Sequence, residues 1–128
     1  WVVPRLTKVH ENVGELMGFF DRWMTYAGYA VITGPNDAAS RVPGLPVIDM
    51  CPPQRYPCRQ LQTRMTIRSD GHMGLCDQDW LAEYALGHID QMSLVEARAR
   101  QQQILARHAV GDFSTAPLCE HCRAWYRH

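Results

Sequence analysis

The first 33 residues place a longer segment with helical spacing between two short apolar runs. Residues 1–4 are typical of the end of a buried strand, and residues 29–33 form a short, continuous apolar strand pattern. Between them, residues 12–27 repeat apolar side chains at the spacing of one helix face, and Gly28 ends the repeat. This order predicts a strand, a helix and a strand of a parallel α/β layer. Because one such unit cannot cover its own faces, we expect residues 1–33 to be the last portion of a larger α/β domain.

Residues 34–57 differ in composition from what precedes them. They contain six prolines in 24 residues and no sustained apolar period, which predicts a linker. Cys51 lies within this linker, where we expect an incidental or packed thiol, with an accessory metal ligand as the alternative.

Alternating apolar and polar side chains then predict a β-hairpin. Residues 61–67 alternate in this way, Asp70-Gly71 is the signal of a two-residue turn, and residues 72–75 return as the second strand. A two-residue turn places Cys76 opposite Met65. Cys58 is then about seven residues, roughly 23 Å, further along a straight strand. A site that contains both cysteines therefore requires the chain to fold back next to Cys58.

A second helix is predicted after the hairpin. Ser93 and Glu96 form the pattern of a capping box, the following residues are rich in Ala, Arg and Gln up to Ala109, and Gly111 provides a stop. Only a thin stripe of this helix is expected to face inward, made of Leu94, Ala97, Gln101, Ile104 and Leu105.

Composition and charge argue against several classes of function. Thirteen basic residues balance thirteen acidic ones, so no net charge favours nucleic acid or an anionic membrane as a partner. The apolar runs are too short to cross a bilayer, and the first residues lack the basic-then-apolar pattern of a signal peptide. We therefore expect a cytoplasmic protein with no nucleic-acid and no membrane partner.

The cysteines carry the clearest candidate chemistry. Their number, five, fits four ligands plus one spare better than a set of disulfides. Cys58 and Cys76 form one pair, and Cys119 and Cys122 form a C-x-x-C. Four thiolates can enclose a zinc ion or an iron–sulfur cluster, because soft sulfur suits both metals. Their positions alone do not choose between the two.

The arrangement of these motifs resembles a known family. Cys58, Gly71 and Cys76 give the pattern C-x12-G-x4-C, which is followed by a capped helix and then by the C-x-x-C. This order looks like the auxiliary-cluster extension that follows the barrel of radical S-adenosylmethionine enzymes, in the shorter twitch form, a truncated relative of the SPASM domain. Residues 1–33 are similar to the last strand, helix and strand of the partial barrel.

The resemblance implies an α+β fold in three parts. Residues 1–33 would be the terminal β-α-β piece of a partial (β/α) barrel, and residues 34–57 a proline-rich linker. Residues 58–128 would be a twitch/SPASM-like cluster-binding domain made of a small β-hairpin and a helix.

The resemblance also implies a cofactor and a role. Cys58, Cys76, Cys119 and Cys122 would bind one auxiliary [4Fe–4S] cluster. Because all four ligands would be thiolates, electron transfer to or from a substrate radical is the expected role, with a structural role as the alternative. S-adenosylmethionine would bind only in the complete enzyme, since the C-x3-C-x2-C motif of the catalytic cluster is absent here. The chain alone is therefore expected to be inactive, with the missing barrel portion or another chain as its partner and a peptide or small metabolite as substrate.

Two other classes of protein compete with this interpretation. A structural zinc-binding interaction module, without catalysis, would use the same four cysteines as its ligands. A thioredoxin-like redox pair is disfavoured, because its C-x-x-C begins a helix after a strand, whereas Cys119 follows Pro117 near the end of the chain. The scattered histidines are expected at the surface, with a hydrogen-bond donor behind the metal ligands as the alternative for each: His72, His88, His108 and His121.

Overall fold

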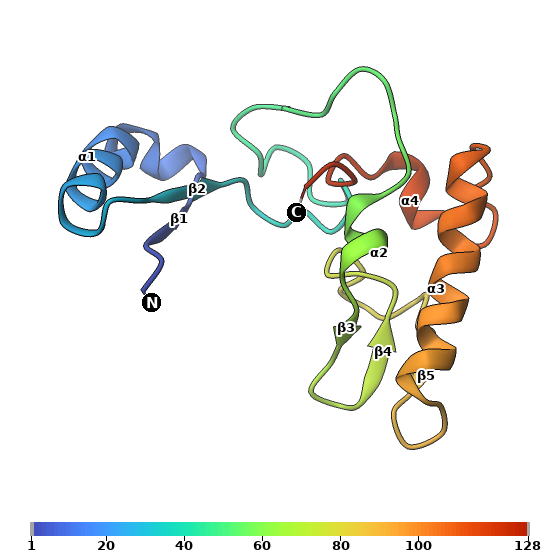
Figure 1. Cartoon of the computed structure of the whole chain (residues 1–128). Helices are drawn as coiled ribbons and strands as arrows, with labels where there is room; N and C mark the ends of the chain where they lie inside the picture. Colours follow the sequence, from blue (N-terminus) through green and yellow to red (C-terminus); the bar gives the residue numbers. More distant parts are fainter. Residues whose placement is uncertain (1, 128) are drawn as a thin grey trace. The chain divides into compact units, whose positions relative to one another are not determined.

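The computed structural model describes residues 2–127 and divides into two compact units (Figure 1). Of the described residues, the first unit comprises 2–37 and 42–49, and the second comprises 38–41 and 50–127. Each unit has its own small sheet, of two strands in the first and three in the second.

The first unit is a strand, a helix and a strand. Strand β1 (Arg5–Thr7) pairs in parallel with β2 (Val31–Thr33). Between them, the 3-10 helix η1 (His10–Glu15) leads directly into helix α1 (Leu16–Ala27). Gly28 ends α1 in the left-handed conformation, with φ of 76°. The predicted order of elements and their parallel pairing are thus confirmed.

The first strand lies later than the sequence pattern predicts. The prediction places it in residues 1–4, but residues 2–3 are exposed and Trp1 lies outside the described residues. Pro4 has no N–H to donate, and its carbonyl accepts from the Val31 N–H at 2.9 Å. Regular pairing therefore starts only after the proline.

The apolar face of α1 is not covered. No residue of Leu16–Ala27 is buried, and Met17, Phe20 and Met24 expose 69%, 39% and 40% of their surface. A helix with such a stripe ordinarily packs it against a sheet or another helix. The two strands β1 and β2 are too few to do so.

The second unit is a small α+β arrangement. Its elements in chain order are α2 (Arg59–Thr63), β3 (Thr66–Ile67), β4 (His72–Gly74), β5 (Gly87–His88), α3 (Leu94–Ala109) and α4 (Leu118–His121). The strands form one antiparallel sheet in the order β3-β4-β5, and α3 packs against α2 beside it (Figure 1). The predicted hairpin and helix are present, and β5 adds a strand that the sequence pattern does not indicate.

The segment predicted as the first hairpin strand begins as a helix. Arg59–Thr63 forms α2, and only the short β3 remains extended. The carbonyls at the end of α2 lack partners within the helix, and Arg98 of α3 donates to those of Leu61, at 2.9 Å, and Gln62. A helix rises about 1.5 Å per residue against about 3.3 Å for a strand. Because α2 is shorter than a strand of the same number of residues, it brings Cys58 closer to Cys76, as a shared site requires.

The hairpin turn is one residue longer than predicted, which shifts the register. Thr66 pairs with Gly74, whereas a two-residue turn at Asp70-Gly71 would pair it with Leu75. Gly71 has a φ of 86°, and its N–H donates to the Arg68 carbonyl at 3.0 Å. This is the three-residue loop with glycine in the left-handed position.

Helix α3 begins and ends where the sequence predicts. The Ser93 hydroxyl accepts from the Glu96 N–H at 3.2 Å, and the Glu96 carboxylate accepts from the Ser93 N–H at 2.9 Å. Ala97 and Gln101 are buried as expected, but Leu94 is 52% exposed and does not belong to the inner stripe.

The core of the second unit includes two of the cysteines. Its buried members are Cys58, Leu61, Met73, Leu75, Leu86, Ala97, Ala116, Cys119 and Trp125. The side chains of Leu61, Met73 and Leu75 have no exposed surface. Because candidate ligands belong to this set, the core and the candidate site are continuous.

We predict that Gly71→Ala lowers the free energy of unfolding more than Gly111→Ala does. Both glycines are left-handed, with φ of 86° and 74°, so each alanine costs about 1–2 kcal/mol. A Cβ at Gly71 would also lie 2.5 Å from His88 Nε2, whereas at Gly111 nothing lies within 4 Å. Displacing the His88 ring adds about 1–3 kcal/mol to the loss in the free energy of unfolding of Gly71→Ala. Anaerobic urea unfolding measures both variants, and equal losses would contradict the close contact at Gly71.

Candidate metal centre

The four predicted ligands line one pocket of the second unit. Cys58 immediately precedes α2, Cys76 follows β4, Cys119 lies in α4 and Cys122 comes directly after it. Apolar side chains make up much of the remaining wall, namely Leu61, Leu118, Ala124 and Trp125. The fold thus brings together all four residues that the sequence singles out, and their role as ligands stays a prediction.

The fifth cysteine occupies a different place. Cys51 is half-buried and packs beside the core, but it does not line the pocket. This position agrees with a packed thiol in the proline-rich segment.

The buried side chain of Gln101 fixes the segment before Cys76 against the end of α2. Its Nε2 donates to the Leu75 carbonyl at 3.2 Å and to the Arg64 carbonyl at 2.9 Å. Its Oε1 accepts from Arg98 at 2.5 Å. Gln101 is only 1% exposed and its bond to Leu75 is buried, so water does not compete for that bond. One side chain therefore sets the position of Cys76 relative to the helix that follows Cys58.

The end of the chain returns to the start of α2. The Arg59 N–H donates to the Trp125 carbonyl at 2.8 Å, so the residues after Cys122 run beside Cys58. Trp125 is buried in the core, as expected of a packing aromatic. The Cys122 N–H donates to the Cys119 carbonyl at 3.3 Å, which closes the C-x-x-C into a turn.

Part of the predicted linker contributes to the pocket. Residues 38–41 belong to the second unit, and Ala39 lines the pocket. Residues 38–40 all have left-handed backbone conformations, with φ between 53° and 71°, and the Ala39 N–H donates to the Gln78 side chain at 2.9 Å. Sequence reasoning missed this turn, because alanine and serine give no signal for a left-handed backbone.

Asp79 closes the loop that follows Cys76. Its buried carboxylate accepts from the N–H groups of Glu83 and Tyr84, each at 3.0 Å. Sequence reasoning also missed this role, although an aspartate before a short polar loop is a common backbone cap.

Burial raises the pKa of three of the candidate ligands. It takes the pKa of the Cys76 thiol from the ordinary 9.0 to about 12 and also raises the pKa of Cys58 and Cys119. Neighbouring thiols raise the pKa further: Cys122 and Cys58 act on Cys76, and Cys76, Cys122 and Cys58 act on Cys119, which reflects the proximity of the sulfurs. At pH 7 these three thiols are therefore protonated, and a metal that binds them displaces protons.

Backbone amides face three of the four sulfurs, from two or three residues further along the chain. They are those of Leu61 and Gln60 at Cys58, Gln78 at Cys76 and Ala124 at Cys122. The last is a hydrogen bond of 3.3 Å, and the others lower the pKa of their thiols against the larger effect of burial. The side chain of Cys58, the residue before α2, does not form a hydrogen bond that caps this helix. Such donors stabilise thiolate ligands and influence the reduction potential of a cluster.

The donor set of the pocket fits an iron–sulfur cluster. Among residues 2–127, no group of three or more His, Cys, Asp or Glu side chains is arranged to hold a single metal ion. A tetrahedral zinc ion needs its sulfurs about 2.3 Å from one point. A [4Fe–4S] cluster distributes its four thiolates over four iron atoms, so the sulfurs stand further apart. Four thiols around one largely apolar pocket, with amides directed at three of them, fit such a cluster.

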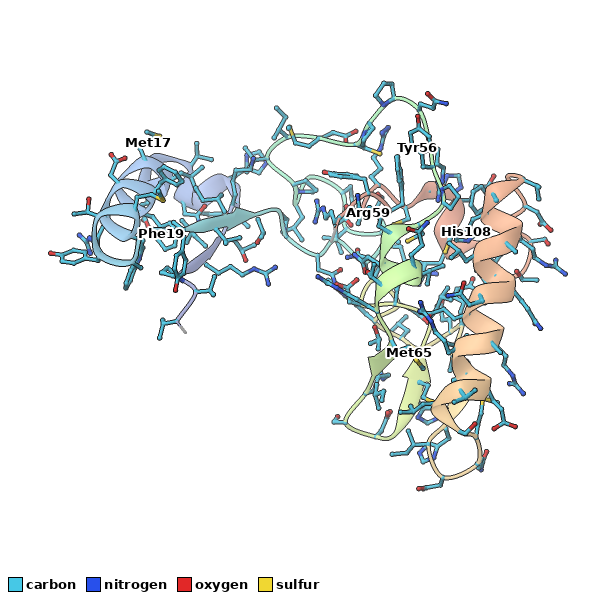
Figure 2. All side chains as sticks on the ribbon, viewed as in Figure 1. Met17, Phe19, Tyr56, Arg59, Met65 and His108 are labelled. Carbon is cyan, nitrogen blue, oxygen red and sulfur yellow. The ribbon has the colours of Figure 1, made fainter. Side chains whose placement is uncertain are left out.

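One histidine is buried rather than at the surface. His108 of α3, labelled in Figure 2, is only 7% exposed, and its ring centre lies 4.9 Å from that of Phe113. Burial, with a smaller contribution from Arg55, lowers the pKa of His108 to about 4. The expectation of a surface position is therefore wrong for His108, which is neutral at pH 7. His72 and His88 are paired across β4 and β5 and do not line the pocket.

Comparison with known proteins identifies the domain. Residues 58–123, just over half of the chain, match the family model of SPASM, an iron–sulfur cluster-binding domain. The chain belongs to the SPASM family. The matched residues begin at Cys58 and include Cys76, Cys119 and Cys122, but not Cys51.

A longer protein resembles nearly the whole of this SPASM chain. Over 123 residues, 96% of the chain, it is 29% identical to an uncharacterized protein of Treponema pallidum (strain Nichols). The chain spans about a third, 34%, of that protein. No solved structure matches the chain. Within residues 2–127, no helix is both long enough and apolar enough to cross a membrane.

We predict that alanine at Cys58, Cys76, Cys119 or Cys122 abolishes or strongly reduces iron binding, whereas Cys51→Ala retains it. Each of the four lines the pocket and Cys51 does not. Iron and sulfide per chain, measured after anaerobic reconstitution, test the assignment. Loss of the cluster in Cys51→Ala together with its retention in Cys119→Ala would contradict it.

The pKa of Cys76 predicts slow alkylation in the folded, metal-free chain. At pH 8, a pKa of about 12 in place of 9.0 reduces the thiolate fraction about 1000-fold. The labelling rate with iodoacetamide should therefore be lower by about that factor than in the same chain unfolded in guanidinium, and should rise about tenfold per pH unit towards pH 12. Peptide mass spectrometry measures the rate, and equal labelling in both states would show that the buried site does not exist without metal.

Proposed function

We propose that the SPASM domain of this chain holds one [4Fe–4S] cluster through Cys58, Cys76, Cys119 and Cys122. In this proposal it serves as the auxiliary electron carrier of a radical S-adenosylmethionine enzyme. The observation that carries the proposal is that four thiols line one pocket in a domain whose family binds iron–sulfur clusters.

The four cysteines favour electron transfer over substrate activation. When bound, the cluster supplies one-electron chemistry. Four protein thiolates occupy every position available to outside ligands, so none remains for a substrate. The apolar wall of Leu61, Leu118 and Trp125 limits the access of water to the sulfurs, and the amides directed at them offset part of their negative charge. These residues thus keep the cluster intact and separate from the reacting substrate.

The first unit supports a role within a larger enzyme. Its parallel strands and the uncovered apolar face of α1 are what the end of a (β/α) barrel would present once its other strands are absent. The Treponema pallidum protein is about three times as long as the chain. We propose that the remaining barrel, in the same polypeptide or another, covers α1, binds S-adenosylmethionine and generates the radical on a peptide or small metabolite. The cytoplasm, where thiols stay reduced, is the proposed location.

Metal content and spectroscopy test the proposal directly. Anaerobic reconstitution should give about four iron and four sulfide ions per chain. The product should be brown and, after reduction, paramagnetic in EPR. A structural zinc site would instead give a colourless, EPR-silent protein with about one zinc per chain. Stoichiometric zinc that iron and sulfide do not displace would refute the proposal.

We further predict that the chain alone does not cleave S-adenosylmethionine. It lacks the C-x3-C-x2-C motif, and its four pocket cysteines leave no iron open to bind the amino and carboxylate groups of that cofactor. Incubation of the reconstituted chain with dithionite and S-adenosylmethionine, followed by chromatography for 5′-deoxyadenosine, measures the activity. Reproducible turnover above a cluster-free control would disprove this prediction.

A further inference from the structure

Arg55 is the only charged side chain among the described residues that line the cysteine pocket. It comes from the proline-rich segment that the sequence predicts to be a linker, and no motif singles it out. Its side chain nevertheless makes several directed contacts with the C-x-x-C segment.

Three contacts hold the Arg55 guanidinium in place. Nη1 donates to the Glu120 carbonyl at 2.9 Å, and Nη2 donates to the Cys119 carbonyl. The guanidinium carbon lies 4.3 Å from the centre of the Phe113 ring, a cation–π arrangement. The planar, forked geometry of arginine allows all three at once, and the charge is permanent. A fixed positive charge is therefore held against the turn that carries two of the pocket cysteines.

The charge acts on the cysteine sulfurs. The guanidinium lines the same pocket as the four sulfurs and donates to the carbonyl of Cys119, so its positive charge stabilises negative charge on the sulfurs. His108 is neutral at pH 7 and supplies no second cation. Arg55 is thus the counter-charge that the pocket presents to its ligands.

We propose that Arg55 is a positioning residue for electron transfer, whose fixed charge raises the reduction potential of the cluster. The inference rests on the proposed function, since it requires a cluster in this pocket. Reduction adds one electron to a centre that already carries the charge of four thiolates. A nearby cation stabilises the reduced form more than the oxidised form, and it does so more strongly in a partly buried site than in water.

The test uses the full 128-residue chain, reconstituted anaerobically, with three variants. Arg55→Gln removes the charge, and Arg55→Lys keeps the charge but cannot reproduce the forked contacts. Arg59→Gln is the matched control, because Arg59 is an exposed arginine next to Cys58 and does not line the pocket (labelled in Figure 2). Iron and sulfide content is measured first, and the midpoint potential is then measured by redox titration followed by EPR, at low and high salt.

The inference predicts a lower midpoint potential in Arg55→Gln and a potential near that of the wild type in Arg55→Lys. Arg59→Gln should change it little, and that small change should vanish at high salt, since exposed charges are screened. An unchanged potential in Arg55→Gln with a full cluster would overturn the inference, as would a potential lowered equally in Arg55→Lys. If Arg55→Gln assembles no cluster, Arg55→Lys provides the test. A potential near that of the wild type supports the inference, and a lowered potential overturns it. A wild-type chain without iron and sulfide would instead overturn the proposed function, and the inference with it.

Discussion

The hydrogen bonds of one buried amide hold the site together. Gln101 joins the Arg64 carbonyl after α2 to the Leu75 carbonyl before Cys76, and its bond to Leu75 is buried. A buried carbonyl without a partner costs about 1–3 kcal/mol, so the Leu75 segment is confined to positions that this side chain can reach. Arg98 reinforces the same junction at the end of α2. The distance between the first two cysteines therefore depends on a polar residue of α3 rather than on the hairpin that connects them.

The same confinement creates a conflict at the cysteines. Cys58 and Cys119 belong to the core, where burial favours the neutral thiol and raises its pKa. A ligand must be the thiolate, so the energy that metal bonds provide must first remove protons that the fold retains. Backbone amides directed at three sulfurs reduce this cost without adding a group that titrates. A small core that contains the predicted ligands would thus gain stability when metal is bound.

Local signals in the sequence predicted those elements that local interactions determine. The capping box of Ser93 and Glu96 and the glycine end of α1 depend on neighbours within a few residues, and both are present. The four pocket cysteines were also identified from their spacing. The helix α2 was not, because residues 61–67 alternate as a strand does. Contacts with distant residues, among them Arg98 and Gln101 some 35 residues away, stabilise the helical alternative. The predicted register of the hairpin was wrong because Asp70-Gly71 fits both a two-residue and a three-residue turn.

Arg55 illustrates why the composition of a segment does not define its role. Prolines at 52, 53 and 57 stiffen the chain around it and deprive those positions of N–H donors. A stiff segment loses little entropy when it is held in one place, so its few contacts suffice to order it. Those contacts are the carbonyls of the C-x-x-C turn, which have no other charged donor in the described pocket lining. The proline-rich stretch is therefore suited to deliver one cation to a defined point, and a glycine- or serine-rich linker of the same length would place that charge less reliably.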